Sequence, residues 1–356
     1  LANDYVGSNN INLLEPIGQF GTRLMGGKDA SQTRYIFTRL SRNTRSLFDV
    51  RDDPILNYLD DDGKPIEPDF YVPVIPTVLV NGTEGIGTGF SSYVPPFNPK
   101  DICNNIERIL SKRPIIPMTP WFKNFKGRVF TNNAGIWITE GVWKKMHNKL
   151  IITELPPGHW TQNYKEYLDT LVEEKIIKEY TNNSTTDEVH FEIMGYTGKD
   201  ANVVKTFRLQ KSVHITNMHL FHPKKGIHKY TSPEEILIDF VEIRLLTYKK
   251  RKLHLLQVLE QRALKSDNMS KFVDMVINER LIVFKRKRNE LESEMTRYFH
   301  RIDNSYDYLL NIKTYQYTHE AVQSLREETA KTKIELEKMK NTTHLEMWKT
   351  DLKICN

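Results

Sequence analysis

The chain has 356 residues, which is too long for one compact core and predicts two or three structural units. Charged residues make up 27%, and no apolar run approaches the ~20 residues that span a bilayer, so a membrane-spanning protein is excluded. The formal net charge of +6 permits a polyanionic partner without requiring one. Since the first residues show neither an initiator methionine nor a secretion signal, we expect an internal piece of a longer protein that is not secreted.

The chain begins with a mixed region that runs from Leu1 to about Pro95, in which glycine and proline separate short helical and strand-like pieces. The stretch from Phe70 to Val80 is apolar and β-branched, but its two prolines argue against a central strand. An acidic run ending at Gly63 begins like a calcium loop but lacks the later ligands, so it predicts a turn.

The middle region, from about Phe97 to Tyr230, alternates strand-like and helical runs. This alternation predicts an α/β unit with a mostly antiparallel sheet. The predicted strands are Gly127–Thr131, Gly135–Thr139, Lys149–Glu154, Glu188–Met194 and Lys205–Leu209, and the predicted helices are Lys100–Leu110 and Asn163–Glu174.

The last region, from Ser232 on, has no glycine, and its only proline is Pro233, so long helices are predicted with a break near Asp303 to Tyr306. An apolar stripe is typical of a helical hairpin within the chain or of one half of a dimer. Basic runs in this region are either solvated helix faces or contacts to a polyanion. The stripe comprises Ile236, Phe240, Ile243, Leu246, Leu253 and Leu256, and the basic runs are Lys249 to Lys252 and Lys285 to Arg288.

Cysteines and histidines give no sign of a metal site. Cys103 and Cys355 are the only cysteines and lie far apart, so we expect neither a disulfide framework nor a zinc–cysteine site, which fits a reducing compartment. The histidines between His214 and His228 match no zinc signature and lack acidic co-ligands nearby.

A candidate nucleophile is Tyr35, which follows a glycine-rich polar stretch and stands next to Arg34. A tyrosine hydroxyl has a pKa of ~10, so it needs cationic neighbours or a metal to attack a phosphodiester. The guanidinium of Arg34 can neutralise the charge that develops on phosphorus, with Arg23 and Lys28 as further cations. The alternative is an amphipathic stretch in which Tyr35 packs and Arg34 is solvated.

A second candidate is the stretch from Asn81 to Phe90, which reads NGTEGIGTGF. Its glycine spacing is weak support for a phosphate-binding loop because no clear strand and helix flank it. An ordinary glycine turn is the alternative.

Several long blocks resemble the breakage-reunion region of eukaryotic-type type IIA DNA topoisomerases. Residues 7 to 23 read GSNNINLLEPIGQFGTR, residues 26 to 40 read GGKDASQTRYIFTRL, and residues 73 to 99 read PVIPTVLVNGTEGIGTGFSSYVPPFNP. Further blocks at 152 to 166, 229 to 245, 306 to 322 and 335 to 352 continue the resemblance in the same order, so that it covers essentially the whole chain.

The resemblance implies an α+β multidomain fold. Residues 1–96 would form a winged-helix-like catalytic portion, incomplete at its N-terminus and carrying a DNA-intercalating loop, and residues 97–231 would form an α/β tower domain with a mostly antiparallel sheet. Residues 232–356 would form a long antiparallel helical arm ending in a globular dimer contact, the C-gate, around Leu281 to Leu325, with the returning helix around Glu327 to Leu352.

The resemblance also implies the chemistry. Tyr35 would form a transient phosphotyrosine link to a 5′ end while Arg34 steadies the phosphorus, and Ile86 would wedge between base pairs and kink the duplex. Further backbone contacts to DNA would come from Arg23, Lys28, Arg208, Lys211 and Asn217. A second duplex would pass through the break before resealing, in an isomerase that relaxes supercoils and decatenates DNA.

Cofactors and partners follow from the same resemblance. Such enzymes use Mg²⁺ and ATP, both held by upstream modules outside this chain, so we expect the fragment alone to bind DNA and dimerise but to cleave little or nothing. Two tyrosines are needed for a double-strand break, which implies a homodimer acting on a gate and a transported DNA segment. The implied location is the nucleus, or the host cytoplasm or viral factory for a viral enzyme.

Some positions depart from the family pattern. Ser31, Gln32 and Thr33 replace the small residues usual before the Arg-Tyr pair, and Met25 stands where many relatives have a polar residue. The segment before Tyr306 is shorter than in animal relatives, which points to a protist or a large DNA virus. Two alternatives stay open: a non-catalytic DNA-binding architectural dimer, and a nucleotide-binding enzyme that uses the glycine loop.

Overall fold

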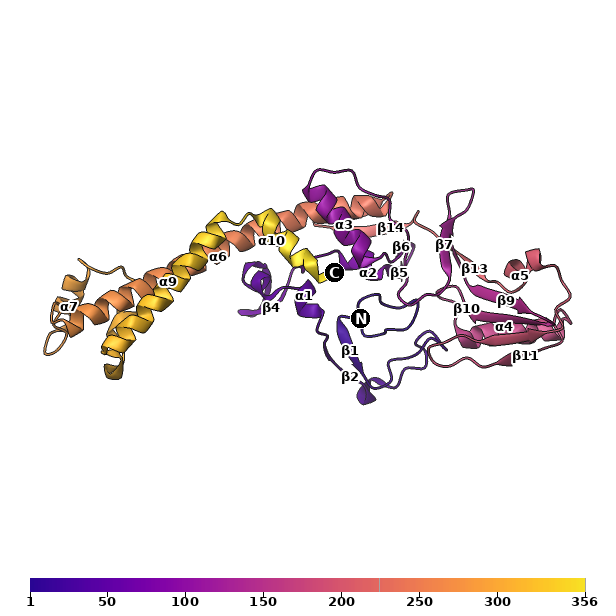
Figure 1. Ribbon diagram of the computed structural model, residues 1–356, viewed down its shortest axis with the longest axis horizontal. Coiled ribbons are helices and arrows are strands. Elements are labelled where there is room, and N and C mark those ends of the chain that lie inside the picture. The colour runs from indigo at the N-terminus through magenta and orange to yellow at the C-terminus, as the bar shows by residue number, and fades with distance from the viewer. Residues whose placement is uncertain (224, 356) are drawn as a thin grey trace. The chain divides into compact units, whose positions relative to one another are not determined.

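The computed structural model describes residues 1–223 and 225–355, which divide into two compact units. One unit comprises Leu1–Arg244 together with the residues from Lys349 on, and the other comprises Leu245–Trp348. The predicted mixture of helices with small antiparallel sheets is confirmed, because the strands of the described residues pair in antiparallel fashion (Figure 1).

The first hundred residues form short hairpins joined by short helices. The stretch from Phe70 to Val80 contains no strand, and Gly63 lies in the turn of a hairpin that the sequence did not predict. The strands are β1 (Leu14–Ile17), β2 (Phe37–Leu40), β3 (Tyr58–Asp61), β4 (Lys64–Pro68), β5 (Thr83–Gly87) and β6 (Phe90–Val94), and the helices are η1 (Thr33–Tyr35), α1 (Thr44–Leu47), η2 (Val50–Ile55), α2 (Thr77–Asn81) and α3 (Pro99–Leu110).

The middle of the chain is built on a four-stranded sheet with strand order β11-β12-β10-β9, along which helix α4 lies (Figure 1). Leu168 and Leu171 of α4 are buried against Ile152 of β10 and Phe191 of β12, which follows from the alternation of apolar residues along the strands. The elements are β9 (Val142–Met146), β10 (Lys149–Glu154), α4 (Thr161–Glu173), β11 (Glu179–Asn182) and β12 (Phe191–Met194).

A second sheet with order β13-β8-β7 adjoins the first along the chain, and a hairpin follows it. The predicted strand Lys205–Leu209 is wrong, because these residues end helix α5 and turn at Arg208, whose φ is 47°. The elements are β7 (Arg128–Thr131), β8 (Trp137–Glu140), α5 (Asp200–Thr206), β13 (Gln210–Val213), β14 (Met218–His222) and β15 (Gly226–Tyr230).

Cys103 in α3 is disulfide-bonded, which the wide separation of the two cysteines did not predict. The side chain of the other cysteine, Cys355, lies outside the described residues. The sequence indicated no disulfide framework and thus missed the disulfide bond of Cys103.

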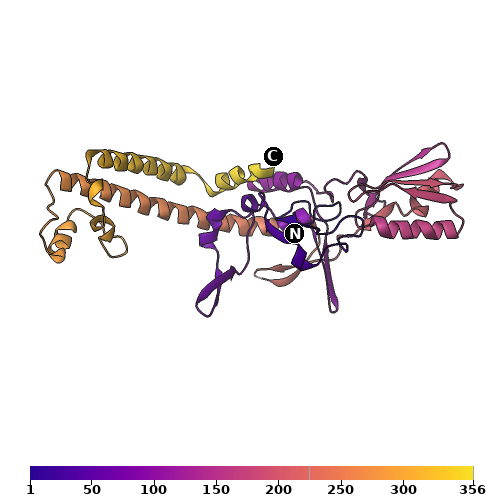
Figure 2. The ribbon, with the colours of Figure 1, turned by 90° about the horizontal axis from the view of Figure 1, so that it is seen from below.

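The second compact unit contains two long helices that run antiparallel (Figures 1 and 2). Lys252 bonds the carbonyl of Lys340 at 3.0 Å, whereas Ser266, further along the first helix, bonds Thr329 at 2.8 Å, earlier in the second. A core that includes Phe272, Met295 and Leu309 closes the end of the helix pair. The remaining elements of the chain, of which the residues up to Arg244 and from Lys349 on belong to the first unit, are α6 (Pro233–Ile277), α7 (Arg288–Met295), α8 (Asp307–Leu310), η3 (Thr314–Gln316), α9 (His319–Asn341), α10 (His344–Asp351) and η4 (Leu352–Cys355).

The predicted apolar stripe of α6 is wrong in part, because Leu246 and Leu253 are exposed, Leu253 by 68%. The fully buried side chains on this stretch include Arg244, Tyr248 and Arg251. An arginine is buried on a helix face only when hydrogen-bond partners satisfy its guanidinium. The apolar residues alone therefore predict the wrong buried face for this stretch of α6. The helix also ends at Ile277, well before the predicted break. A turn does occur at the predicted break, where Ile302 pairs with Ser305.

Arg244 is a buried cation that ties α6 to the N-terminal region. Its Nη1 donates to the carboxylate of Asp52 at 2.7 Å and to the carbonyl of Val72 at 2.6 Å. We expect Arg244→Met to lower the free energy of unfolding by about 3–5 kcal/mol, because it removes a cation from a buried carboxylate. Chemical denaturation checks this, with Arg45→Met, which removes an exposed pair with Asp53, expected to cost less than about 1 kcal/mol. Equal losses in the two variants would contradict the assignment.

Candidate active site and nucleic-acid interface

Tyr35 ends the short helix η1, between the two strands of the β1–β2 hairpin. Its amide donates to the carbonyl of Gln32 at 2.9 Å, and the hairpin pairs Ile17 with Phe37 directly beyond it. The side chain is 63% exposed, so its hydroxyl is open to a large substrate. The guanidinium carbon of Arg34 lies 5.0 Å from the centre of the tyrosine ring. A cation at this distance can bind the oxygens of a phosphate that approaches Tyr35.

Residues 18–31, the loop that leads to Tyr35, are held in shape by glycine contacts and by one carboxylate. Gly21 and Gly27 have φ of 98° and 86°, and a Cβ on Gly21 would lie 2.4 Å from the Cα of Gly27. Asp29 accepts hydrogen bonds from the amide of Thr22 at 2.8 Å and from its hydroxyl. Burial raises the pKa of Asp29, but the bonds from Thr22 outweigh it and hold that pKa below its usual value.

Arg23 has a different place from the one predicted. Its side chain is 4% exposed and forms an ion pair with Glu154, and it also donates to the carbonyl of Leu155 at 3.2 Å. A guanidinium buried in this way cannot reach a phosphate on the surface. We therefore leave Arg23 out of the DNA surface proposed below, whereas Lys28 is exposed on the same loop and stays in it.

Ile86 lies in β5, at the end of the β5–β6 hairpin, and its side chain is 86% exposed. Strand β6 of this hairpin is fastened to Asn217, the residue before the strand that begins at Met218. Asn217 donates from Nδ2 to the hydroxyl of Ser91 at 2.7 Å, and its carbonyl accepts from the amide of Tyr93 at 2.9 Å. Asn217 thus supports the hairpin that carries Ile86, besides any contact of its own with DNA.

Arg208 and Lys211 lie beside a pocket of about 170 Å³ at the start of α4. The guanidinium of Arg208 stacks on the ring of Tyr167 at 3.9 Å, and the ammonium of Lys211 donates to the carbonyl of Pro157 at 3.2 Å. Burial lowers the pKa of Lys211, opposed by the charge of Glu84. The pocket is lined by Gly158, His159, Trp160, Asn163, Tyr164, Tyr167 and Arg208.

Sequence reasoning missed His159 in this cluster. Burial and then the charges of Lys211 and Arg208 lower its pKa, so that the imidazole is favoured in its neutral form. The only sequence signal was its place in the run PPGHW, between the predicted strand ending at Glu154 and the predicted helix beginning at Asn163.

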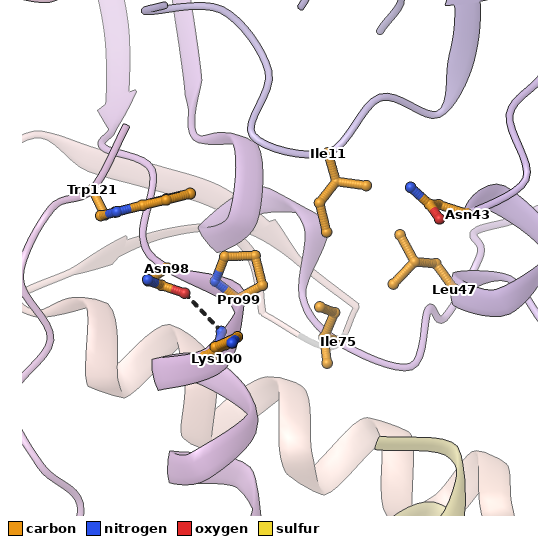
Figure 3. A pocket seen from close by; sticks show the side chains of 8 residues that line it. All are labelled: Ile11, Asn43, Leu47, Ile75, Asn98, Pro99, Lys100 and Trp121. Carbon is orange, nitrogen blue, oxygen red and sulfur yellow. Dashed lines mark hydrogen bonds between the residues drawn. The ribbon is translucent and has the colours of Figure 1, made fainter. Parts of the chain in front are cut away.

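A cavity of about 470 Å³ in the first unit contains none of the predicted site residues (Figure 3). Ile11, Leu47 and Trp121 line it with the N-terminal end of α3, where Asn98 caps the amide of Lys100 at 2.9 Å. Across residues 1–223 and 225–355, no group of three or more His, Cys, Asp or Glu side chains is arranged to hold a metal ion. Within the same residues, no helix combines the length and apolar character needed to cross a bilayer.

Comparisons with known proteins agree on one family. The family described as the A subunit of DNA gyrase/topoisomerase IV matches residues 1–353. DNA topoisomerase 2 of Plasmodium falciparum is 40% identical over 99% of the chain and 28% of its own length, and that of Pisum sativum is 42% identical over 83% and 21%. The chain thus spans about a quarter of the length of these relatives.

A solved structure has the same fold. It is described as the crystal structure of Plasmodium falciparum topoisomerase II DNA-binding, cleavage and re-ligation domain, and it matches with a TM-score of 0.90 at 41% identity. The match covers 99% of this chain and 53% of that one.

Gly26 supplies a test of the loop. A Cβ there would lie 2.2 Å from the indole of Trp160, and its φ is +60°. We expect Gly26→Ala to destabilise the protein by about 2–4 kcal/mol, because backbone strain adds to overpacking. Thermal and chemical unfolding check this. The control is Gly85→Ala, where a Cβ would meet nothing within 4 Å in the part of the chain described, and its cost should stay within about 0.5 kcal/mol. A Gly26→Ala protein as stable as this control would contradict the packing.

Proposed function

This chain belongs to the family of the DNA gyrase/topoisomerase IV A subunit, and from that premise we propose that it is the breakage-reunion part of an ATP-dependent type II DNA topoisomerase. The observation that carries the proposal is the exposed hydroxyl-bearing ring of Tyr35 beside the guanidinium of Arg34, on a hairpin that presents both. The intact enzyme would relax supercoils and decatenate DNA, as an isomerase.

In the proposed reaction the hydroxyl oxygen of Tyr35 attacks a backbone phosphorus. A bond forms between that oxygen and phosphorus, the bond from phosphorus to the 3′ oxygen breaks, the tyrosine loses its proton and the 3′ oxygen gains one. Arg34 stabilises the negative charge that grows on the non-bridging oxygens. The phosphotyrosine link keeps the energy of the broken bond, so the 3′ hydroxyl can reseal the strand after a second duplex has passed.

The DNA surface that we propose combines one apolar wedge with scattered cations. Ile86 enters between base pairs at the cost of a few kcal/mol of unstacking and leaves a kinked duplex. Lys28, Arg208 and Lys211 contact the phosphates, which positions the DNA without reading its sequence. Asn217 holds the hairpin beneath Ile86.

We place the cofactors outside this chain. Relatives of this family use Mg²⁺ and ATP, and the described residues offer no acidic cluster that fits a divalent cation. Mg²⁺ would activate the scissile phosphate from an upstream module, and ATP would drive strand passage from another. On this view the chain supplies the nucleophile and depends on these modules for cleavage.

A double-strand break needs two tyrosines, so we propose a homodimer. Residues 281–325 are the proposed contact, because this range contains several exposed large apolar side chains, among them Ile282, Phe284 and Tyr315. For the domains we propose the three parts that the resemblance implies, namely residues 1–96 as the catalytic portion, 97–231 as the tower and 232–356 as the arm with the C-gate.

We propose the nucleus as the location, although a relative in Dictyostelium discoideum is described as mitochondrial.

The nucleophile can be tested by trapping the covalent intermediate. The chain, supplied with the magnesium-binding module, is incubated with supercoiled DNA and Mg²⁺ and quenched with detergent. We expect protein attached to 5′ ends, and at least about a thousandfold less with Tyr35→Phe, because the attacking oxygen is gone. Tyr58→Phe changes another exposed tyrosine and should leave the adduct unchanged. A native protein that binds DNA without forming an adduct would favour an architectural role instead.

The wedge can be tested by measuring DNA bending. A duplex labelled at both ends should show a shorter end-to-end distance by fluorescence transfer when the protein binds. We expect Ile86→Ala to lose most of that bend, because the side chain that fills the opened step is removed. Ile66→Ala truncates an exposed isoleucine on the β3–β4 hairpin and should bend DNA as the native protein does. A full bend with Ile86→Ala would remove the wedge from the proposal.

A further inference from the structure

The segment from Glu154 to Gln162 joins the last residue of β10 to the first turn of α4. One side of it contacts the loop that leads to Tyr35. The other side contacts Arg208 and Lys211, the cations proposed to bind DNA. The segment therefore touches both parts of the proposed site.

On the loop side, four positions of the segment are fastened. The guanidinium of Arg23 pairs with Glu154, which is 1% exposed, and bonds the carbonyl of Leu155. The amide of Gln162 donates to the carbonyl of Leu24 at 2.9 Å. Trp160 lies against Gly26 so closely that no side chain fits between them.

The carboxylate of Glu154 is fixed at both oxygens. Its Oε2 accepts from the amide of Lys126 at 3.1 Å, and its Oε1 accepts from the amide of Leu155 at 2.9 Å as well as from Arg23. A buried pair whose oxygens are all engaged holds one geometry, although it contributes little net stability against an apolar replacement. The pair is thus suited to positioning the loop.

On the DNA side, the contacts are equally close. Lys211 donates to the carbonyl of Pro157 at 3.2 Å, and a Cβ on Gly158 would lie 2.4 Å from its ammonium. His159 and Arg208 line the same pocket, and burial, together with the charges of Lys211 and Arg208, lowers the pKa of His159. A phosphate that draws either cation outward therefore acts on residues 157–159 directly.

The loop in turn reaches the nucleophile. Its two ends are joined by the amide of Ser31, which donates to the carbonyl of Gln19 at 3.0 Å. At its start, a Cβ on Gly18 would lie 3.1 Å from the carbonyl oxygen of Tyr35. Displacement of the loop therefore moves the backbone that carries Tyr35.

We propose that residues 154–162 couple the seating of DNA at Arg208 and Lys211 to the placement of Tyr35, with Arg23 and Glu154 as the positioning pair. The proposal rests on the function proposed above. It replaces the phosphate contact expected of Arg23 with a role inside the protein. Under this proposal, cations far from Tyr35 in the sequence act on its reaction because one segment contacts both these cations and the loop.

The first measurement separates binding from cleavage. We expect Glu154→Gln, in the chain supplied with the magnesium-binding module, to bind duplex DNA within about threefold of the native affinity and to form the Tyr35 adduct about a hundredfold more slowly in a single turnover. Arg23→Lys keeps the charge but not the planar guanidinium whose Nη2 bonds both Glu154 and Leu155, and should slow the adduct about tenfold. The control Glu15→Gln removes an exposed pair with Arg39 on the β1–β2 hairpin and should change neither quantity.

The second measurement does not depend on cleavage. Hydrogen–deuterium exchange of residues 19–31 is followed in the chain with and without a duplex. We expect DNA to slow exchange there in the native chain and in Glu15→Gln, but not in Glu154→Gln, although DNA is bound. If Glu154→Gln does not fold, as judged by thermal melting, Arg23→Lys decides by the same two measurements.

The outcomes separate the two proposals. The coupling is overturned if a folded Glu154→Gln protein cleaves at the native rate, or if DNA does not change the exchange of the loop in the native chain. The proposed topoisomerase function is unaffected by either result. The function is overturned and the coupling is supported if the native protein forms no adduct but DNA still slows exchange in its loop, and does not do so in Glu154→Gln. A chain that binds no DNA overturns both.

Discussion

Buried pairs between a guanidinium and a carboxylate hold together parts of this chain that lie far apart in the sequence. Arg23 and Glu154 are 131 positions apart, and Arg244 and Asp52 are 192 apart. Removing such charges from water is costly, and the cost is offset only when the geometry is good and further hydrogen bonds complete it. Leu155 and Val72 supply these bonds with their carbonyls. The pairs therefore specify how the short hairpins of the first unit are arranged, in a region with few long elements to do so.

The supporting residues and the groups proposed to act on DNA are separate sets. Tyr35 and Ile86 stand in solvent, whereas the residues behind them, such as Glu154 and Asn217, make several short hydrogen bonds each. This division suits a protein whose substrate is a large duplex. In the proposed role the exposed groups meet DNA, and the supporting residues keep them where the reaction needs them.

The sequence predicted correctly the helices and strands that have strong local patterns. The predictions failed where local patterns are ambiguous or where a residue distant in the sequence determines the structure. Strand β10 and helices α3 and α4 match predicted ranges because apolar alternation and helical spacing are clear there. Lys205–Leu209 was wrong because a short alternation of polar and apolar residues does not distinguish a helix end from a strand. Tyr35 and Arg34 were predicted from the family resemblance, since a lone Arg-Tyr pair has no local signature, and their roles stay a prediction. The burial of Arg23 depends on its ion pair with Glu154, and no residue near Arg23 in the sequence predicts that partner.

The hairpin tip at Ile86 has a consequence for the protein before it meets DNA. A large apolar side chain kept in water costs about 1.5–3 kcal/mol relative to a buried one, and Phe221 on the neighbouring strand is 84% exposed as well. Two such exposed apolar side chains promote association between separate copies of the protein. In the role proposed here, the duplex covers the Ile86 tip, so DNA serves the protein as a solubilising partner in addition to being its substrate.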